Sequence, residues 1–127
     1  MGMFKKKVTV YNLYDQSLFS EADFWVDTGA LYSFIPEDFV EKIKLEPSGT
    51  RNLVFADGRT DRRLFGTCLF EIEGLEDKVP CPVIIAPKGS LFLLGATALE
   101  NFGVQADPIN KKLVPILSII GGFRASS

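Results

Sequence analysis

The sequence contains no histidine among its 127 residues. This absence excludes a Ser-His-Asp triad, a Cys-His nucleophile pair and any metal site built on imidazole. Cysteine is scarce as well, because only Cys68 and Cys81 are present and their spacing is not that of a Cys-x-x-Cys motif. We interpret them as buried free thiols of an intracellular protein, although the sequence leaves a disulfide between them open. Neither a metal nor a cofactor is expected.

Strong charge and long apolar runs are also missing. The net charge is −2 with no large basic block, which argues against nucleic acid as a partner. The apolar stretch Leu113–Ile120 is far shorter than the ~20 residues of a membrane span and contains Pro115 and Ser118. With no evident signal peptide, these features predict a cytoplasmic protein that does not associate with membranes. A hydrophobic content of 46% mildly favours a buried subunit interface.

Short apolar segments separated by turn residues predict an all-β fold with one or two short helices. One helix is expected to start at Pro36, and a second is expected over Ala96–Phe102 with Gly103 as its C-cap. No internal repeat or domain boundary is visible, so we expect a single domain over 1–127, with its core at about 8–115 and a tail over 116–127. The expected strands are Val8–Tyr11, Leu18–Val26, Tyr32–Ile35, Asn52–Ala56, Leu64–Phe70, Val79–Ala86, Leu91–Gly95, Val104–Asp107, Leu113–Val114 and Ile116–Ile120.

Two local patterns refine this expectation. Asp57-Gly58 between apolar segments predicts a hairpin, whose polar tip over Asp57–Arg63 should project from the body. Pro80 and Pro82 cannot donate to a ladder, so part of the strand that contains them should lie at an edge or a bulge.

The motif that carries chemistry is Asp27-Thr28-Gly29-Ala30, directly behind the apolar run 24–26. Asp-Thr-Gly is the loop on which aspartic peptidases mount their catalytic carboxylate, and that chemistry needs two carboxylates sharing one proton. The tripeptide occurs once in the chain, so the second aspartate would have to come from a second copy. Taken alone, the tripeptide is also compatible with an ordinary turn.

With its context, the chain resembles the retropepsin-like aspartic peptidases, in particular their small prokaryotic single-domain members. The resemblance covers roughly Val8 to Pro115 and rests on three segments: Val26–Ala30 with Ile35-Pro36; Phe55–Arg59; and Leu93–Glu100 with Asp107-Pro108 and Lys112–Pro115. It implies a closed β-barrel or sandwich of the retropepsin type that forms a homodimer. It also implies an aspartic endopeptidase acting on peptide or protein substrates.

The resemblance further assigns a role to individual residues. Asp27 would be the catalytic carboxylate, and the Thr28 hydroxyl would bond across the two-fold axis to lock the paired loops. Gly29 would permit a tight turn and close approach of the substrate backbone. Gly95 matches the glycine beneath the catalytic loop, where a side chain would collide with the loop.

Ala30 and the hairpin distinguish this chain within the family. Ala30 has no hydroxyl to donate to the catalytic carboxylate, which suggests activity at milder acidity than in a relative with serine there. Asp57-Gly58 would tip a flap that closes over bound peptide. This flap is charged rather than glycine-rich and apolar as in the viral pattern, so it is also compatible with a solvated hairpin that never contacts substrate.

Two other interpretations remain open from the sequence. The chain could be a peptide-binding or dimerisation module that has the fold without turnover, and the charged flap favours this. It could also be an unrelated small β-barrel with a chance Asp-Thr-Gly. If the chain forms a dimer, as a peptidase or as a binding module, the apolar residues Leu117, Ile119 and Ile120 would allow the tail to add strands to the dimer interface.

Overall fold

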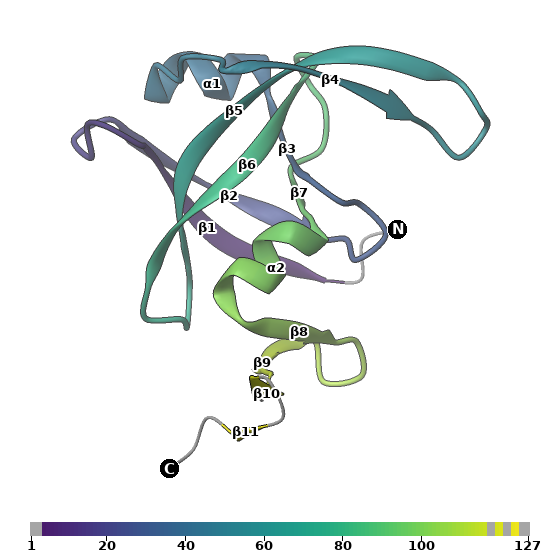
Figure 1. The fold of residues 1–127 in the computed structure, drawn as a ribbon. Coiled ribbons are helices and arrows are strands. Elements are labelled where there is room, and N and C mark those ends of the chain that lie inside the picture. Colours follow the sequence, from purple (N-terminus) through teal and green to yellow (C-terminus); the bar gives the residue numbers. More distant parts are fainter. Residues whose placement is uncertain (1–3, 117–118, 121–122, 125–127) are drawn as a thin grey trace.

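A computed structural model describes residues 4–116, 119–120 and 123–124. The fold is built almost wholly of strands, with two short helices (Figure 1). In chain order the elements are β1 (Lys5–Asn12), β2 (Phe19–Val26), β3 (Ser33–Pro36), α1 (Glu37–Ile43), β4 (Gly49–Val54), β5 (Thr60–Ile72), β6 (Lys78–Ala86), β7 (Leu93–Leu94), α2 (Ala96–Phe102), β8 (Val104–Asp107), β9 (Lys112–Pro115), β10 (Ile119–Ile120) and β11 (Phe123–Arg124). The all-β fold expected from the sequence is confirmed.

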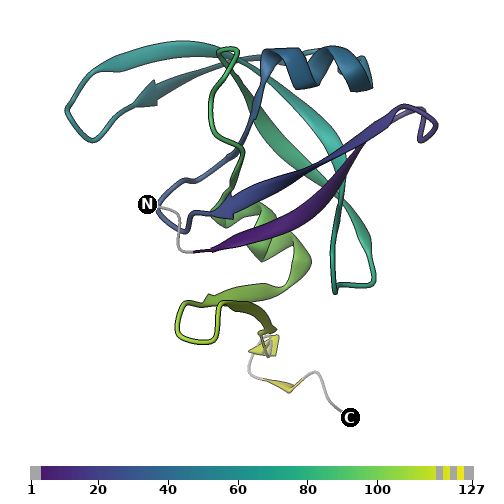
Figure 2. The same cartoon turned by 180° about the vertical axis from the view of Figure 1, so that it is seen from behind.

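The main sheet closes on itself into a barrel. Its strands run in the order β1-β2-β7-β3-β6-β5-β4, and β1 also pairs with β5, which joins the two ends of the sheet. β4 is the one strand of this sheet left outside the closure, and it pairs only with β5. The β4–β5 hairpin therefore extends beyond the barrel, as both views show (Figures 1 and 2).

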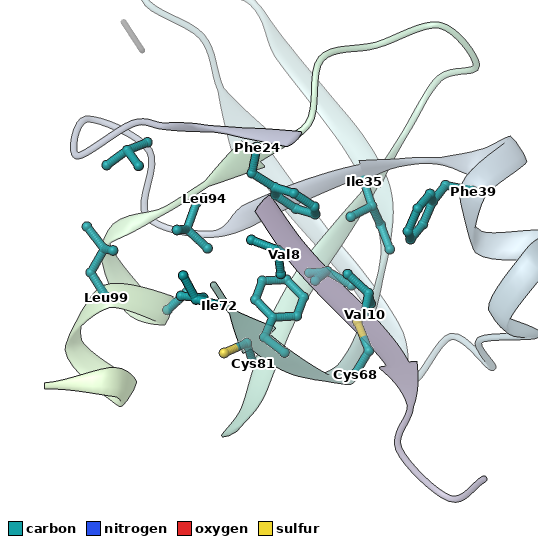
Figure 3. Packing of buried hydrophobic residues seen from close by; sticks show 14 of the residues in the cluster. Val8, Val10, Phe24, Ile35, Phe39, Cys68, Ile72, Cys81, Leu94 and Leu99 are labelled. Carbon is teal, nitrogen blue, oxygen red and sulfur yellow. The ribbon is translucent and has the colours of Figure 1, made fainter. Parts of the chain in front are cut away.

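Alternation along the strands fills the barrel with apolar side chains. Val8, Phe24, Ile35 and Leu94 are fully buried and, together with Phe39 at the α1 side, belong to one hydrophobic cluster (Figure 3). The Phe24 ring packs edge-on against two further phenylalanine rings, with centroids 5.6 and 5.2 Å apart. Burying each such side chain contributes roughly 1.5–3 kcal/mol. The core thus lies directly beneath the strands that lead into the Asp-Thr-Gly loop.

Each of the two helices ends at a residue with a left-handed backbone conformation. α2 spans the expected residues, and Gly103 closes it with φ 69°. α1 ends at Ile43 because Lys44 turns left-handed at φ 51°, which leaves Leu45 buried but outside the helix. The chain then enters β4.

The proline-containing half of β6 lies at an edge, as expected. β6 pairs with β5 from Lys78 to Ile84, whereas β3 joins it only from Val83 onward. At Pro80, the side of β6 that faces away from β5 is covered by α2. The Asn101 side-chain amide of this helix donates to the Pro80 carbonyl at 3.2 Å. The missing proline N–H groups therefore cost the sheet no pairing.

The chain after α2 forms small sheets of its own. Within the part of the chain that the structure describes, β8 and β9 pair only with each other, and so do the two-residue strands β10 and β11. Of the expected strand at 116–120, Ile119–Ile120 form β10 and Ile116 is not in a strand, while Leu117 and Ser118 lie outside the described residues. None of the helices described is long and apolar enough to cross a lipid bilayer.

The two cysteines are free, buried and opposite one another in the β5–β6 ladder. Burial raises the pKa of Cys81 to about 12, and burial together with the neighbouring Cys81 raises the pKa of Cys68 as well. Because only the thiolate reacts, both should resist alkylation by iodoacetamide at pH 8 in the folded protein. Mass spectrometry should find two modified cysteines after unfolding in urea and none before. Rapid modification of the folded protein would contradict this assignment.

Candidate active site

Asp27 lies at the end of β2, where the strand leaves the barrel wall. The Asp27 N–H donates to the Leu94 carbonyl at 3.0 Å, and the preceding Val26 N–H donates to the Phe4 carbonyl at 2.8 Å. β2 and β7 run parallel here, with Val26 opposite Leu94. The backbone that carries the carboxylate is therefore fixed from both sides by the sheet.

The loop that follows folds back on the aspartate. The Gly29 N–H donates to Asp27 Oδ1 at 3.0 Å, and the Ala30 N–H donates to the Asp27 carbonyl at 3.2 Å. The turn is tight, and Gly29 makes it without a left-handed φ. A Cβ at this position would lie 3.4 Å from Asp27 Oδ1, at ordinary contact with the carboxylate.

Gly95 lies in the tightest place of the site. A Cβ on Gly95 would stand 2.4 Å from the Tyr32 carbonyl oxygen and 2.9 Å from that of Ala30. Real Cβ atoms do not approach backbone so closely, so any other residue would displace the loop or the α2 segment. Glycine is required here by the close approach of two backbone segments.

Hydrogen bonds across this contact hold the two segments together. The Gly95 N–H donates at 3.0 Å to the hydroxyl of Ser33, the one fully buried polar side chain among the described residues. The first two N–H groups of α2 donate to the carbonyls of Ala30 at 2.7 Å and Leu31 at 3.0 Å. Helix α2 has no side-chain cap, so carbonyls of the Asp27 loop satisfy its N-terminus instead.

A cleft of about 590 Å³ separates the Asp27 loop from β4 and the turn after it. The Asp27 loop, β3 and β7 form the floor and wall of the cleft. β4 and the turn after it form its roof. The lining residues are Asp27, Gly29, Ala30, Leu31, Tyr32, Phe34, Asn52, Leu53, Val54, Phe55, Ala56 and Leu93. The structure thus brings a half-buried carboxylate to the bottom of a mainly apolar groove.

Four of the residues singled out from the sequence do not line this cleft. Thr28 is exposed on the loop, and Gly95 lies beneath it. Asp57 and Gly58 form the turn of the β4–β5 hairpin, where Gly58 has φ +87°. Of the chain's Asp-Thr-Gly-Ala motif, the Asp27, Gly29 and Ala30 positions are the ones that reach the groove.

The hairpin tip is held together by its own charges. Arg59 Nε contacts Asp57 Oδ2 at 2.7 Å, and the Arg59 N–H donates to Asp57 Oδ1 at 3.0 Å. These two interactions lower the pKa of the Asp57 carboxyl. The Arg59 guanidinium also lies 5.3 Å from the centre of the Phe55 ring, which faces the cleft. The tip charges are therefore paired with each other rather than directed at Asp27.

Sequence reasoning missed most of the apolar lining. Tyr32, Phe34, Leu53 and Leu93 look like ordinary strand residues, and only closure of the barrel brings them around Asp27. Ser33 gave no signal beyond its place inside an apolar strand. Across the described residues, no group of three or more carboxylates or thiols is arranged to hold a metal ion.

Comparisons with known proteins agree with this geometry. The profile of a family described as aspartyl protease matches residues 15–98. The fold is similar to that of EIAV protease complexed with the inhibitor HBY-793, with a TM-score of 0.55 and 17% identity over 87% of this chain and 90% of that one. No curated protein matches the chain.

A second similar structure belongs to a much longer protein. It is the foamy viral protease-reverse transcriptase in complex with an RNA/DNA hybrid, with a TM-score of 0.52 and 19% identity over 89% of this chain. The match spans 13% of that viral chain. At such identities, both likenesses show a shared retropepsin fold and nothing about substrates.

Replacing Gly95 tests the close approach beneath the loop. Gly95→Ala should lower the free energy of unfolding by about 1–3 kcal/mol or more, because its Cβ collides with backbone that cannot move aside. Gly49→Ala is the matched control, since a Cβ there meets nothing within 4 Å. Urea denaturation of both variants measures the difference. Equal stability of the two variants would contradict the packing described.

Proposed function

The chain belongs to the aspartyl protease family, and from this we propose that it is an aspartic endopeptidase whose active site is completed by a second copy of the chain. The observation that carries the proposal is the position of Asp27 at the bottom of a cleft roofed by a projecting hairpin. The motif occurs once, so one chain supplies one of the two carboxylates that the chemistry needs.

In the proposed reaction, two Asp27 carboxylates face each other across the two-fold axis and share one proton. One acts as general base and takes a proton from a water held between them, and the water oxygen attacks the scissile carbonyl. The other acts as general acid and protonates the carbonyl oxygen. On collapse of the tetrahedral intermediate, the carboxyl that took the water proton gives it to the leaving amine, and the other carboxylate takes a proton back from a hydroxyl of the intermediate. No covalent enzyme intermediate forms.

Thr28 and the β8–β9 hairpin support a dimer of this kind. Thr28 is exposed beside Asp27, where its hydroxyl can bond to the partner's loop. β8 and β9 pair with no other strand of the described chain, so their outer edges are open to strands from a second copy. The exposed Leu31, at 61%, would also be covered by a subunit that brings the second carboxylate to the cleft.

The cleft supports an extended peptide as substrate. β4 is an edge strand with one side unpaired among the described residues, and its residues 52–54 line the groove. An extended peptide can pair with such an edge while its alternate side chains enter apolar pockets. The proposed substrates therefore carry apolar side chains beside the scissile bond, and Asp57-Gly58 would move as the tip of a flap over them.

Removing the carboxylate tests the catalytic proposal. Asp27→Asn should abolish cleavage of an unstructured peptide library between about pH 4 and 7, because an amide can neither accept nor release the shared proton. Asp15→Asn is the control, since Asp15 lies in the exposed β1–β2 turn and bonds to Ser17. Cleavage products are counted by mass spectrometry. Absence of cleavage by wild type, in a folded and dimeric protein, would favour a peptide-binding module instead.

Ala30 sets a pH test of the same site. Ala30→Ser adds a hydroxyl next to Asp27 that can donate to its ionised form, so the pH optimum of cleavage should move downward. Ala30→Gly serves as the control because it adds no donor. The measurement is a pH profile of kcat/KM on one good peptide. An optimum that stays or rises in the serine variant would disprove the suggested role of Ala30.

A further inference from the structure

A second cavity of about 330 Å³ adjoins the cleft under the β4–β5 hairpin. The two hollows share four apolar residues, Phe34, Leu53, Phe55 and Leu93, which form a continuous wall from one to the other. The remaining wall comes from the end of β6 and the loop before β7. Its charged lining residues are Asp61 and Arg63, both on β5.

Arg63 is mostly buried in this cavity, with 24% of its side chain exposed. Its Nε donates to the Ile85 carbonyl at 3.1 Å, which fixes the guanidinium at the cavity wall. Among the described residues the two terminal nitrogens of Arg63 make no hydrogen bond, and neither of them is fully buried. Such a charge is costly in an apolar hollow unless an anion meets it.

Asp61 neutralises the positive charge of Arg63 only weakly. Its Oδ2 lies 3.9 Å from the nearer terminal nitrogen of Arg63, which is beyond hydrogen-bond distance. Its Oδ1 accepts instead from the Arg62 N–H at 2.8 Å. The guanidinium therefore keeps donors that a ligand carboxylate could take up in a bidentate contact.

A second arginine strengthens the positive field on this side of the hairpin. Arg51 lies directly opposite Arg63 in the β4–β5 ladder, an arrangement of like charges that destabilises a hairpin by itself. The Arg51 guanidinium lies 3.8 Å from the centre of the Phe65 ring, which packs on Tyr32 of the cleft wall. Residues 49–65 carry four arginines and two aspartates in a chain of net charge −2, so the hairpin is cationic and the rest is anionic.

From these observations we propose that the cavity is an anion-selecting subsite of the protease, and that its preferred substrates place a glutamate side chain there. The methylene stem of glutamate would pass along the apolar wall shared with the cleft, and its carboxylate would bond to Arg63. Lysine at this position would be rejected by the two arginines. The subsite rests on the proposed function, because it selects substrates for the same cleft.

The test uses peptides with one apolar cleavage site and glutamate, glutamine or lysine at each of the four positions on either side. Glutamate should exceed glutamine in kcat/KM by about tenfold at one position, with lysine the poorest. In Arg63→Gln the ratio at that position should fall to near one. Arg62→Gln, on the opposite face of the same strand, should keep the wild-type ratio.

If Arg63→Gln does not fold, two further measurements still test the subsite. In wild type, the preference for glutamate should weaken as salt rises from about 50 to 500 mM, because it is electrostatic. The Asp61→Asn variant should show a stronger preference for glutamate, because a carboxylate that competes for Arg63 is removed. A wild type without glutamate preference at any position, a preference independent of salt, or an unchanged ratio in Arg63→Gln would overturn the subsite.

Binding separates this proposal from the failure of catalysis. If no peptide is cleaved, fluorescence anisotropy of labelled glutamate and glutamine peptides measures the same preference without turnover. Tighter binding of the glutamate peptide, lost in Arg63→Gln, would support the subsite in a non-catalytic protein. Equal binding of both peptides would overturn it.

Discussion

The close contact between the Asp27 loop and the segment from Gly95 into α2 is the constraint on which the rest of the site depends. It brings two backbones within a distance that only glycine allows, and hydrogen bonds from Gly95 and from the first residues of α2 seal it. The loop carbonyls supply the missing cap of the helix, and the helix in turn fixes the loop. Neither segment could hold its conformation alone, since helix N-terminal donors and loop carbonyls would both lack partners.

Closure of the barrel gives this contact its rigidity and the site its shape. Pairing of β1 with both β2 and β5 joins the ends of the sheet, so the strands that carry Asp27 and Gly95 cannot separate. β4 remains outside the closure, and the hairpin that it forms with β5 becomes the roof of the cleft. A fixed floor and a projecting roof suit a substrate that must enter as an extended chain and then be held in place.

Charge is distributed differently in these two parts. The floor combines one half-buried carboxylate with apolar side chains, whereas the roof carries the arginines. At the tip, Asp57 pairs with Arg59. Deeper in the hairpin, the carboxylate of Asp61 lies beyond hydrogen-bond distance of Arg63. The charges of the hairpin thus divide into the Asp57–Arg59 pair at its turn and Arg63, which lines the hollow beneath, with Arg51 opposite it in the ladder.

The sequence by itself determined most of the strands, both helices with the Gly103 cap, the hairpin at Asp57-Gly58 and the loop at Asp27, although β7 spans Leu93–Leu94 and not the expected Leu91–Gly95. These features are local, because they depend on alternation, turn residues and motifs within a few neighbouring positions. Resemblance also pointed to Gly95 beneath the loop. Only the tertiary structure decided the lining of the cleft, the role of Ser33 and the place of Arg63, because these join residues far apart in the chain, such as Ser33 and Gly95, which are 62 positions apart. Contacts between distant strands depend on barrel closure and register, and no local pattern encodes which side chains those will bring together.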